Sequence, residues 1–432
     1  MRCRVAGADM IALALLSVFC LAAGVLGFTY AGYPLLMALL ARLRPQALHA
    51  SAGAHLGTTV SCREAGRAQV RSYTSTSAPE AAETIPSALP RIDVLLVAHN
   101  AAFQVGPKLR NLLELDYPQD LLRIHVVCDG CDDATEAAAR ALASPRMRVV
   151  AHAQRRGKSA CIADALPSLD ADIVLFTDVR QRIDAHAARV LAAALADPRV
   201  GAVSGELVLE ADNGYGRGID AYWRYEKLLR RLESASGSII GATGALYAAK
   251  RALLQAPPPG IILDDMWIPL AIAAQGYRVV FVPQALAFDR GARDSVSEEA
   301  RKRRTLAGNY QLLHRWPQLA LPGAHPLALR LWGHKWLRLV APWCLLALLA
   351  TNALLARGGD AFFVATFALQ VAGYALAFAG RLWPALATAV LPVRICGAFF
   401  SLNLSALLAL SDYLRNPRAY LWRTTQLGAA SR

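Results

Sequence analysis

The sequence predicts a doubly wound α/β domain with a parallel sheet, held between transmembrane helices at both ends of the chain. Three observations predict this fold class. Long uncharged apolar stretches lie near each end, whereas the middle alternates short apolar runs with amphipathic stretches. Such alternation is typical of strands and helices that form a parallel sheet with helical cover. Polar side chains also follow several apolar runs directly, where sheets of this kind bind their ligands.

The composition narrows the class of protein. Of the 432 residues, 55% are hydrophobic and 18% are charged, which argues against a wholly soluble, disordered or fibrous chain. The net charge of +14 favours an anionic partner: a phosphate, a nucleic acid or the inner face of a membrane. Because the basic residues are dispersed and form no known nucleic-acid module, we expect no nucleic-acid partner.

The cysteines indicate the compartment. The eight cysteines are scattered along the chain, so they predict neither a secreted disulfide framework nor a four-cysteine zinc site. A single pair, Cys128 and Cys131, is weak evidence for a redox or zinc motif. We therefore expect the catalytic part of the chain to lie in a reducing compartment.

The N-terminal segment, residues 1–44, predicts a membrane anchor. Residues 10–41 contain no charged side chain, and roughly 20 apolar residues are enough to cross a bilayer. Tyr30 and Tyr33 are placed as interfacial aromatics, with Arg42 just beyond them. A cleaved signal peptide is the alternative, but the apolar stretch is about twice as long as a signal core.

The C-terminal segment, residues 339–432, predicts a second membrane region. Its uncharged stretches are residues 339–356, 361–380 and 395–411, each close to a membrane span in length. With the N-terminal anchor they predict about four spans. Residues 382–393 are too short to span and contain prolines, which favours an interfacial or re-entrant piece.

Residues 321–338 predict an amphipathic helix at the membrane surface. Trp332 and Trp336 alternate there with basic side chains such as Lys335 and Arg338. This pattern is typical of a helix in the headgroup region, and an ordinary surface helix is the alternative.

The middle of the chain divides into a linker and a domain. Residues 45–90 are rich in Ala, Ser, Thr, Pro and Gly without periodicity, which predicts a flexible linker. Residues 91–320 form the predicted α/β domain. Its first strands are expected at residues 92–98, 123–128, 147–151 and 172–177, with helices at 105–115, 132–142 and 158–166.

Polar residues follow three of these strands. Asn100 follows the first strand, Asp129 and a further acidic pair follow the second, and Asp178 with Arg180 follows the fourth. Each alone could be a turn residue or a helix cap. Because the carboxyl ends of parallel strands share one edge of the sheet, we expect these side chains to lie together.

Two further segments carry candidate chemistry. The basic run that ends in Gly157 and Lys158 precedes a helix and could bind a diphosphate, although it is not a P-loop because position 152 is His rather than Gly. Asp264 and Asp265 follow an apolar run, and a carboxylate there can act as a general base. The cations at residues 301–304 suit either a phosphate or anionic lipid.

Taken in order, five segments resemble the membrane-bound family 2 glycosyltransferases, which include cellulose, hyaluronan and poly-N-acetylglucosamine synthases. They are VAHN at 97–100, NLLELDYP at 111–118, DGCDDAT at 129–135, GKSA at 157–160 and FTD at 176–178. The resemblance implies a GT-A fold, a Rossmann-like nucleotide-sugar domain that is cytoplasmic. It also implies that the protein is an enzyme, a hexosyltransferase.

The resemblance also implies roles for individual residues at the donor. Asn100 and Asp129 would hold the uracil and ribose, and Lys158 would lie near the diphosphate. Asp178 would be the first acid of an Asp-x-Asp metal motif for Mg or Mn, and Arg301 and Arg304 would add counter-charge.

The acceptor side follows from the same resemblance. Asp265, preceded by Asp264, would deprotonate an acceptor hydroxyl and lead to inversion at the anomeric carbon. Gly241, Thr243 and Gly244 would line the acceptor site, with tight backbone packing as the alternative reason for their small size.

Two departures from the family pattern bear on these expectations. Arg180 stands where the second metal acid is expected, so the site either binds metal with fewer protein ligands or uses Arg180 itself as counter-charge for the diphosphate. The Gln-x-x-Arg-Trp motif of the processive synthases is missing from the basic run, and its nearest match, residues 311–316, is one residue too long. Chain elongation is therefore less strongly implied than sugar transfer.

The leading hypothesis is an inner-membrane enzyme that transfers sugar from a UDP-sugar to a saccharide, building a cell-surface or extracellular polysaccharide. Export or accessory subunits are possible partners. Transfer to a polyprenyl phosphate is the second hypothesis, because the basic residues 301–304 suit a lipid phosphate. The third is a degenerate nucleotide-binding partner of an active synthase.

Overall fold

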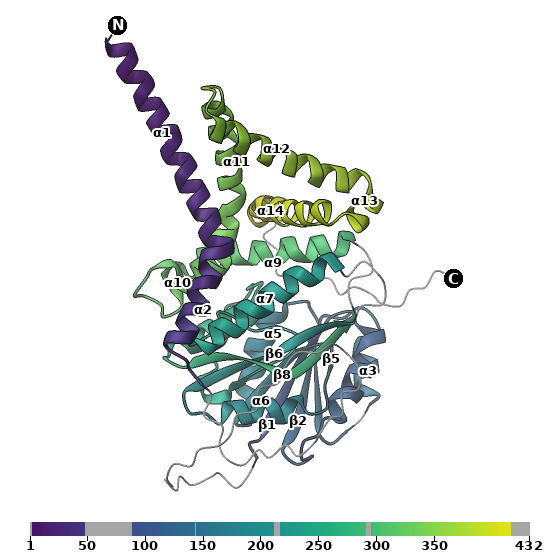
Figure 1. Ribbon diagram of the computed structural model, residues 1–432. Coiled ribbons are helices and arrows are strands. Elements are labelled where there is room, and N and C mark those ends of the chain that lie inside the picture. Colours follow the sequence, from purple (N-terminus) through teal and green to yellow (C-terminus); the bar gives the residue numbers. More distant parts are fainter. Residues whose placement is uncertain (1, 48–88, 143, 211–216, 291–294, 416–432) are drawn as a thin grey trace, which may run out of the picture.

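The α/β domain lies at one end of the molecule and a group of long helices at the other (Figure 1). The computed structural model describes residues 2–47, 89–142, 144–210, 217–290 and 295–415. Most of the predicted linker, residues 45–90, falls outside these ranges.

One mixed sheet of eight strands forms the centre of the domain, in the order β3-β2-β1-β4-β7-β6-β8-β5. The strands β3, β2, β1 and β4 run parallel, while β7 is antiparallel to both of its neighbours. The parallel start predicted from the sequence is confirmed, and the rest of the sheet is mixed. The strands are β1 (Ile92–Ala98), β2 (Leu122–Asp129), β3 (Met147–His152), β4 (Ile173–Asp178), β5 (Arg182–Ile183), β6 (Val200–Glu210), β7 (Tyr247–Lys250) and β8 (Arg278–Arg290).

Helices connect the strands and cover both faces of the sheet. They are α3 (Ala102–Leu113), α4 (Thr135–Arg140), α5 (Lys158–Ala165), α6 (Ala187–Leu195), α7 (Arg217–Ala235), α8 (Asp264–Ala274) and α9 (Ser295–Arg315). The helix predicted at residues 132–142 is shorter in the structure. Asp133 accepts a hydrogen bond from the Thr135 backbone N–H, so the residues before Thr135 form a capped turn.

The sheet separates two apolar cores. Along β1, Val94 and Leu96 pack with α3 and α6 on one face, whereas Leu95 and Val97 pack with α5 and α8 on the other. This alternation follows from the two-residue period of a strand. The second core also includes Trp336, which lies between the domain and the long helices.

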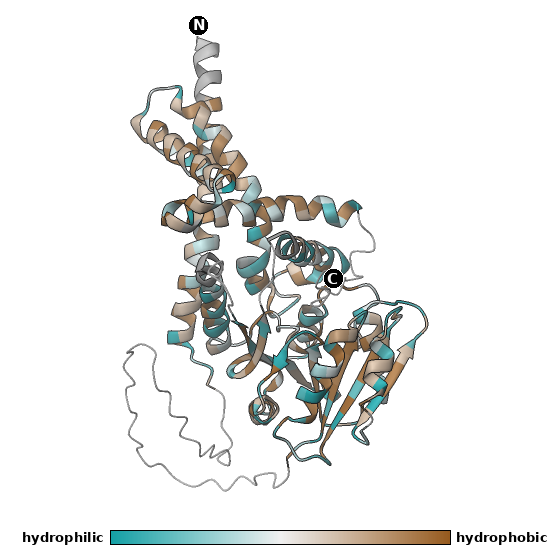
Figure 2. Ribbon diagram, turned by 90° about the vertical axis from the view of Figure 1, so that its right-hand side faces the viewer, coloured by the Kyte–Doolittle hydropathy of each residue, from teal (hydrophilic) through white to brown (hydrophobic). Residues whose placement is uncertain are grey.

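Within the described residues, four helical segments are long and apolar enough to cross a membrane: Met10–Leu43, Ala328–Ala356, Ala361–Leu382 and Leu391–Arg415. Much of their ribbon has the brown colour of hydrophobic residues (Figure 2). The first contains α1 (Arg2–Gly27), a π-helical turn η1 (Phe28–Gly32) and α2 (Tyr33–Leu43). The others are α10 (Ala328–Leu331) with η6 (Trp332–Trp336) and α11 (Leu337–Ala356), then α12 (Ala361–Leu382), α13 (Pro384–Ala389) and α14 (Leu391–Arg415).

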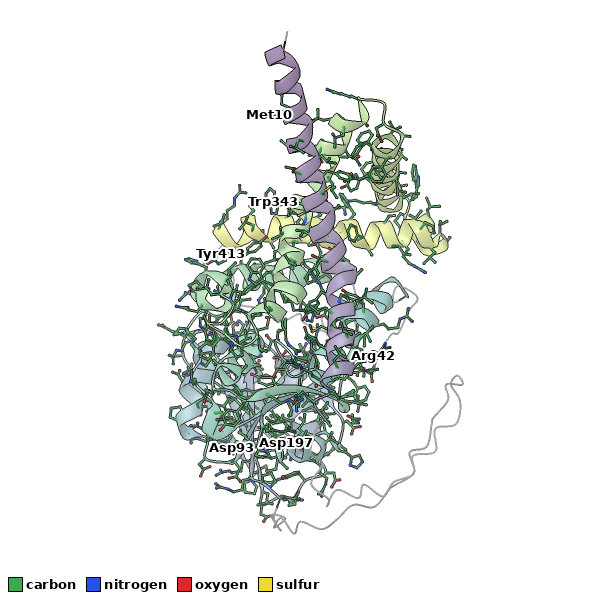
Figure 3. The ribbon with its side chains drawn as sticks, turned by 60° about the vertical axis from the view of Figure 1, so that its left-hand side comes forward. Met10, Arg42, Asp93, Asp197, Trp343 and Tyr413 are labelled. Carbon is green, nitrogen blue, oxygen red and sulfur yellow. The ribbon has the colours of Figure 1, made fainter. Side chains whose placement is uncertain are left out.

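The long helices do not all run in one direction. Helix α1 packs beside α11, and Figure 3 shows Met10 at the end of α1 far from the domain and Arg42 at the domain surface. Helix α14 instead lies across this direction and packs along α9 (Figure 1). The last predicted span therefore contacts the helix that carries the basic run.

Residues 321–338 differ from the predicted interfacial helix. They lead through α10 and η6 directly into α11, and His334 is only 1% exposed. Both ring nitrogens of His334 lie 2.8 Å from a carboxylate of α7, Glu226 on one side and Glu233 on the other. Lys335 and Arg338 of this segment also form ion pairs with the buried Glu226, so these basic side chains bind the domain.

The junction between α2 and η6 gives a test of this packing. A Cβ on Gly333 would overlap the Tyr33 ring, whereas a Cβ on Gly373 of α12 would meet nothing within 4 Å. We expect Gly333→Ala to lower the free energy of unfolding by about 1–3 kcal/mol because the two helices must separate. The thermal midpoint in detergent measures this, with Gly373→Ala as the control. Equal midpoints for the two variants would contradict the packing described.

Candidate active site

Three carboxylates and a lysine meet at the carboxyl edge of the sheet. Asp178 ends β4, Lys158 begins α5, and Asp264 and Asp265 begin α8. The Lys158 ammonium lies 2.8 Å from Asp178 Oδ1 and 3.1 Å from Asp264 Oδ2. The sequence-predicted residues Lys158, Asp178, Asp264 and Asp265 are therefore brought together.

Gly244 completes this cluster from a third direction. Its backbone N–H donates to Asp265 Oδ2 at 3.1 Å. A Cβ at this position would lie 3.1 Å from Asp178 Oδ2 and 3.4 Å from Asp265 Oδ2. A side chain here would thus make a tight contact with Asp178, which would have to move by a few tenths of an ångström.

The charges of the cluster shift one another's pKa values. Burial, and then the neighbouring Asp264, raise the pKa of Asp265 to about 6. Burial alone would lower the pKa of Lys158, but Asp178 and Asp264 raise it above its ordinary value. Lys158 is therefore a permanent cation at neutral pH, while Asp265 titrates close to neutrality.

Arg304 approaches the same cluster from α9. Its guanidinium lies 3.5 Å from the Ile262 carbonyl, and within the described part of the chain its buried Nε has no hydrogen-bond partner. Burial lowers the pKa of Arg304, and Asp264 and Asp265 act in the opposite direction. Arg301, one turn earlier, is exposed. Arg303 instead forms an ion pair with Asp412 of α14, at 2.6 Å.

Asp129 supports the cluster indirectly. The sequence predicts it as a uracil and ribose contact, but it is fully buried. Its two carboxylate oxygens accept backbone N–H bonds from Arg156 at 2.6 Å and from Gly157 at 2.9 Å. Gly157 has φ +92°, which favours glycine. Asp129 therefore holds the loop that presents Lys158, because the buried N–H groups of that loop need acceptors.

Asn100 links the loop after β1 to the loop after β2. Its backbone adopts φ +48°, and its side-chain oxygen accepts from the Asp132 N–H at 3.1 Å. The neighbouring His99 ring lies 2.7 Å from the Asp129 carbonyl. The loops after β1 and β2 are thus joined at the sheet edge, and Asn100 remains partly exposed there.

Arg180 forms an ion pair with Asp289, which lies outside the Lys158 cluster. Its guanidinium forms an ion pair with Asp289 of β8 at 2.5 Å, and Gln181 Nε2 donates to the same carboxylate oxygen at 3.0 Å. The sequence predicts Arg180 as counter-charge for a diphosphate, whereas in the structure its own charge is balanced by a buried carboxylate. Strand β8 lies far from β4 in sequence, so no local pattern indicates this pair.

The three predicted acceptor residues, Gly241, Thr243 and Gly244, have different surroundings in the structure. A Cβ on Gly241 would lie 2.7 Å from Met266 Cγ, so Gly241 is set by packing. The Thr243 N–H donates to Ser204 Oγ at 3.1 Å. Of the three predicted residues, Gly244 is the one that contacts a site carboxylate.

Two residues near the cluster carry no assigned role in the sequence analysis. Gln311 accepts from the Ile262 N–H at 2.8 Å and donates to the Gly260 carbonyl at 2.7 Å, and so it holds the segment before Asp264. Tyr247 stacks on Phe176 with ring centroids 4.5 Å apart. Burial, and then the site carboxylates, raise the pKa of Tyr247. Only the near match of residues 311–316 to a family motif could have pointed to Gln311.

A metal would meet a sparse set of ligands here. In the described ranges, no three His, Cys, Asp or Glu side chains come together as a ready site. The side chain of Asp178 is 40% exposed, whereas that of Asp264 is 7% exposed. A single carboxylate is compatible with an ion such as Mg²⁺, which takes one or two carboxylates and completes its shell with phosphates and waters.

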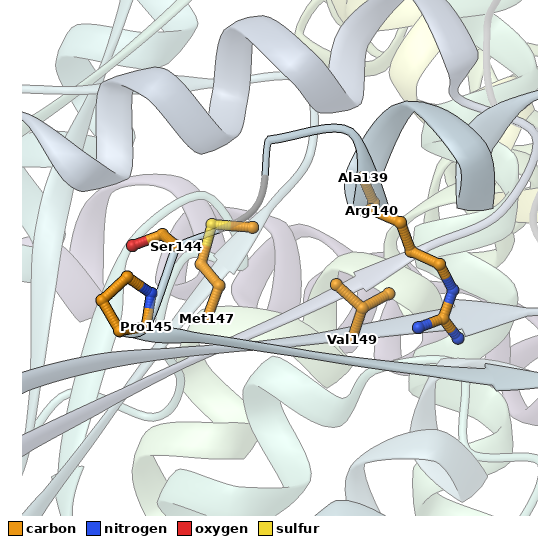
Figure 4. Close-up of a pocket in the computed structure, with 6 residues that line it drawn as sticks. All are labelled: Ala139, Arg140, Ser144, Pro145, Met147 and Val149. Atoms are coloured by element: carbon orange, nitrogen blue, oxygen red, sulfur yellow. The ribbon is translucent and has the colours of Figure 1, made fainter.

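A surface pocket lies elsewhere on the domain (Figure 4). It is lined by Ala139, Arg140, Ser144, Pro145, Met147 and Val149, beside the edge strand β3. None of these residues belongs to the carboxylate cluster, so this pocket is separate from the candidate site.

The site combines carboxylates and a lysine at the carboxyl ends of the parallel strands, the edge at which α/β sheets bind their ligands. A family model described as "Glycosyltransferase like family 2" matches residues 90–318, which is more than half of the chain. The chain belongs to this family. The resemblance stated from the five sequence segments is thereby confirmed.

Individual relatives agree with this assignment. The chain is 27% identical over 228 residues to an N-acetylglucosaminyltransferase of Rhizobium meliloti (strain 1021), covering 48% of this chain and 53% of the relative. It is 24% identical over 244 residues to a β-monoglucosyldiacylglycerol synthase of Synechocystis sp. (strain ATCC 27184 / PCC 6803 / Kazusa), covering 53% and 50%. The chain thus spans about half the length of the curated relatives it matches.

The solved structures show the same fold. The mannosyltransferase PcManGT from Pyrobaculum calidifontis, in complex with GDP-Man and Mn²⁺, superposes with a TM-score of 0.64 at 24% identity. The match covers 92% of this chain and 99% of that one. The predicted GT-A fold class is confirmed.

The loop held by Asp129 gives a prediction. Asp129→Asn replaces one acceptor oxygen by an amide that cannot accept from the loop N–H groups. We expect it to lower the free energy of unfolding by about 1–3 kcal/mol because a buried donor loses its partner. Denaturant unfolding measures this change. The exposed Asp132→Asn serves as the control and should stay within about 0.5 kcal/mol of wild type; similar values for both variants would refute the role of Asp129.

Proposed function

We propose that this protein is an inverting glycosyltransferase that uses a nucleoside-diphosphate sugar, a UDP-sugar in the first instance. Its product is a cell-surface or extracellular polysaccharide, made at the inner membrane from a cytoplasmic site. The observation that carries the proposal is Asp265, a half-buried carboxylate with a pKa raised to about 6 by burial and Asp264, beside two cations. One site thus combines a base with groups that bind phosphate.

The base chemistry follows from the surroundings of Asp265. Its carboxylate accepts the proton of an acceptor hydroxyl, and the hydroxyl oxygen forms a bond to the anomeric carbon of the sugar. The bond from that carbon to the diphosphate breaks, and the nucleoside diphosphate leaves with the electron pair on the opposite face. A base with a pKa near the working pH suits this step. The Gly244 N–H holds one carboxylate oxygen of Asp265, which orients the base.

The leaving diphosphate gains negative charge that cations must balance. We propose that Lys158, presented by the loop that Asp129 holds, and the half-buried guanidinium of Arg304 supply this positive charge. Asp178 would hold a Mg or Mn ion together with donor phosphates, and such an ion would supply further counter-charge. Asn100, at the open loop after β1, is proposed to contact the nucleoside, and Arg301 to lie at the outer edge of the donor site.

The membrane helices suggest where the acceptor comes from. Arg303 of α9 is tied to Asp412 of α14, so the helix that bears Arg304 also contacts a candidate membrane helix. This contact favours, as a second candidate, transfer to a lipid-linked acceptor such as a polyprenyl phosphate. The name of the Synechocystis relative, a glucosyldiacylglycerol synthase, is consistent with a lipid acceptor. We expect export or accessory subunits as partners only if the product is a polysaccharide.

The base assignment gives the first functional prediction. We expect Asp265→Asn to lower kcat by about 10²–10⁴-fold, the usual contribution of a general base. Release of UDP from a panel of UDP-sugars by detergent-purified protein, with and without Mg²⁺ or Mn²⁺, measures this. The exposed Asp120→Asn is the matched control and should keep wild-type turnover.

Each outcome of that assay has a distinct meaning. Full activity of Asp265→Asn would show that another residue is the base. If wild type binds UDP yet no sugar is transferred in native membranes supplied with lipid acceptors, the protein is a nucleotide-binding partner and the enzyme proposal fails. Products of several sugar units support the polysaccharide proposal, whereas single-sugar lipid products support the second candidate.

The raised pKa of Asp265 predicts the pH dependence. The base form of an acid with a pKa of about 6 is present above that pH and is lost as the pH falls below it. We therefore expect kcat to fall by about tenfold per pH unit below about pH 6, as a single essential base requires. The pH profile of UDP release measures this, with thermal midpoints recorded at each pH. A flat profile across this range would contradict Asp265 as the base.

A further inference from the structure

A second lysine lies beneath the carboxylate cluster, buried in the middle of α3. Lys108 is 3% exposed. Its ammonium donates to Thr177 Oγ1 at 2.8 Å and to the Gln181 carbonyl at 2.6 Å. In the described parts of the chain, no carboxylate lies within ion-pair distance of it. Burying an unpaired ammonium is costly, and burial lowers the pKa of Lys108 to about 7, while Asp178 acts in the opposite direction.

The alternation of β4 places the two lysines on opposite faces of the sheet. Phe176 packs in the core on the side of α5, and Lys108 belongs to α3, which covers the other side. Because successive side chains of a strand alternate, Asp178 faces Lys158 and Thr177 faces Lys108. The end of β4 is thus held from both faces of the sheet. Lys158 contacts the Asp178 carboxylate on one face, and Lys108 contacts Thr177 and the carbonyl of Gln181 on the other.

The contacts of Lys108 extend to three segments around Asp178. Thr177 Oγ1 donates to the Ala245 carbonyl at 2.8 Å, and Ala245 follows the glycine that contacts Asp265. Gln181, whose carbonyl accepts from Lys108, also donates to the carboxylate that pairs with Arg180. One ammonium therefore joins the end of β4, the loop after it and the segment that carries Gly244.

We propose that Lys108 is a positioning residue that sets the place of Asp178, and through Asp178 the binding of the donor diphosphate. This inference rests on the proposed function, because it takes Asp178 to face the donor. Lys108 touches no substrate itself. Its two hydrogen bonds hold the Thr177 side chain, just before Asp178, and the Gln181 backbone carbonyl, three residues after it, so their loss shifts the carboxylate relative to Lys158 and Asp264.

The chain offers a matched control one turn further along α3. Asn111 donates to the Ile183 carbonyl at 2.9 Å and accepts from the Ile183 N–H at 2.8 Å. Like Lys108, Asn111 thus makes two hydrogen bonds from α3, here to Ile183 of β5, but it carries no charge. A purely structural link between α3 and this segment would make both residues equally important.

The experiment compares Lys108→Met with Asn111→Leu in the full-length protein. We expect Lys108→Met to weaken UDP binding by at least about tenfold, and kcat by a similar factor, since a small displacement at a site can cost up to about 10²-fold. Asn111→Leu should change both by less than about threefold at a comparable loss of thermal midpoint. Calorimetric titration with UDP, UDP release and thermal unfolding supply the readouts. Equal effects of the two variants on UDP binding would overturn the proposal.

Thr177→Val supplies a second test that keeps the lysine in place. It removes one acceptor of Lys108, and the two changes combined should weaken UDP binding by less than the product of the single effects, because they break one shared contact. Independent effects would overturn the proposal. If Lys108→Met does not fold, Thr177→Val alone decides the matter: we expect it to weaken UDP binding by more than about threefold, and UDP affinity within about threefold of wild type would overturn the proposal. UDP affinity needs no turnover, so the test stands even if wild type transfers no sugar. That result would defeat the proposed function alone.

Discussion

The requirement to hold three carboxylates together at one edge of the sheet governs the structure of this site. Asp178, Asp264 and Asp265 repel one another, and Lys158, within 2.8 Å of Asp178 and 3.1 Å of Asp264, offsets that repulsion. The balance is incomplete, so the pKa of Asp265 stays raised by burial and by Asp264. The site thus has both a firmly held cation and a carboxylate that can accept a proton near neutrality.

Much of the surrounding sequence serves to place these four side chains. Asp129 orders the loop before Lys158 through two backbone N–H groups, and Gln311 orders the segment before Asp264 through two more hydrogen bonds. Lys108 contacts both sides of Asp178. These supports are polar groups buried for positioning, which is the arrangement expected where a site must be held in one geometry.

The site is also mechanically connected to the helices that are apolar enough to cross a membrane. His334 and Tyr33 meet Glu233 of α7 in a buried network, and Arg303 of α9 pairs with Asp412 of α14. Helix α9 carries Arg304 into the carboxylate cluster, so one helix links the cluster to α14. A change in the position of α14 would therefore be transmitted to the carboxylate cluster through α9.

The sequence by itself determined the apolar spans, the parallel strands and the polar residues that follow them, because these depend on hydrophobic periodicity and on strand direction. Asp178, Lys158 and Asp265 could be predicted as site residues from the sequence for the same reason. Only the tertiary structure decided that Arg180 pairs with Asp289, that Asp129 binds a loop and that His334 is buried between two acids. These contacts join residues far apart in the chain. Their partners depend on how the strands and helices pack, which no local pattern of residues records.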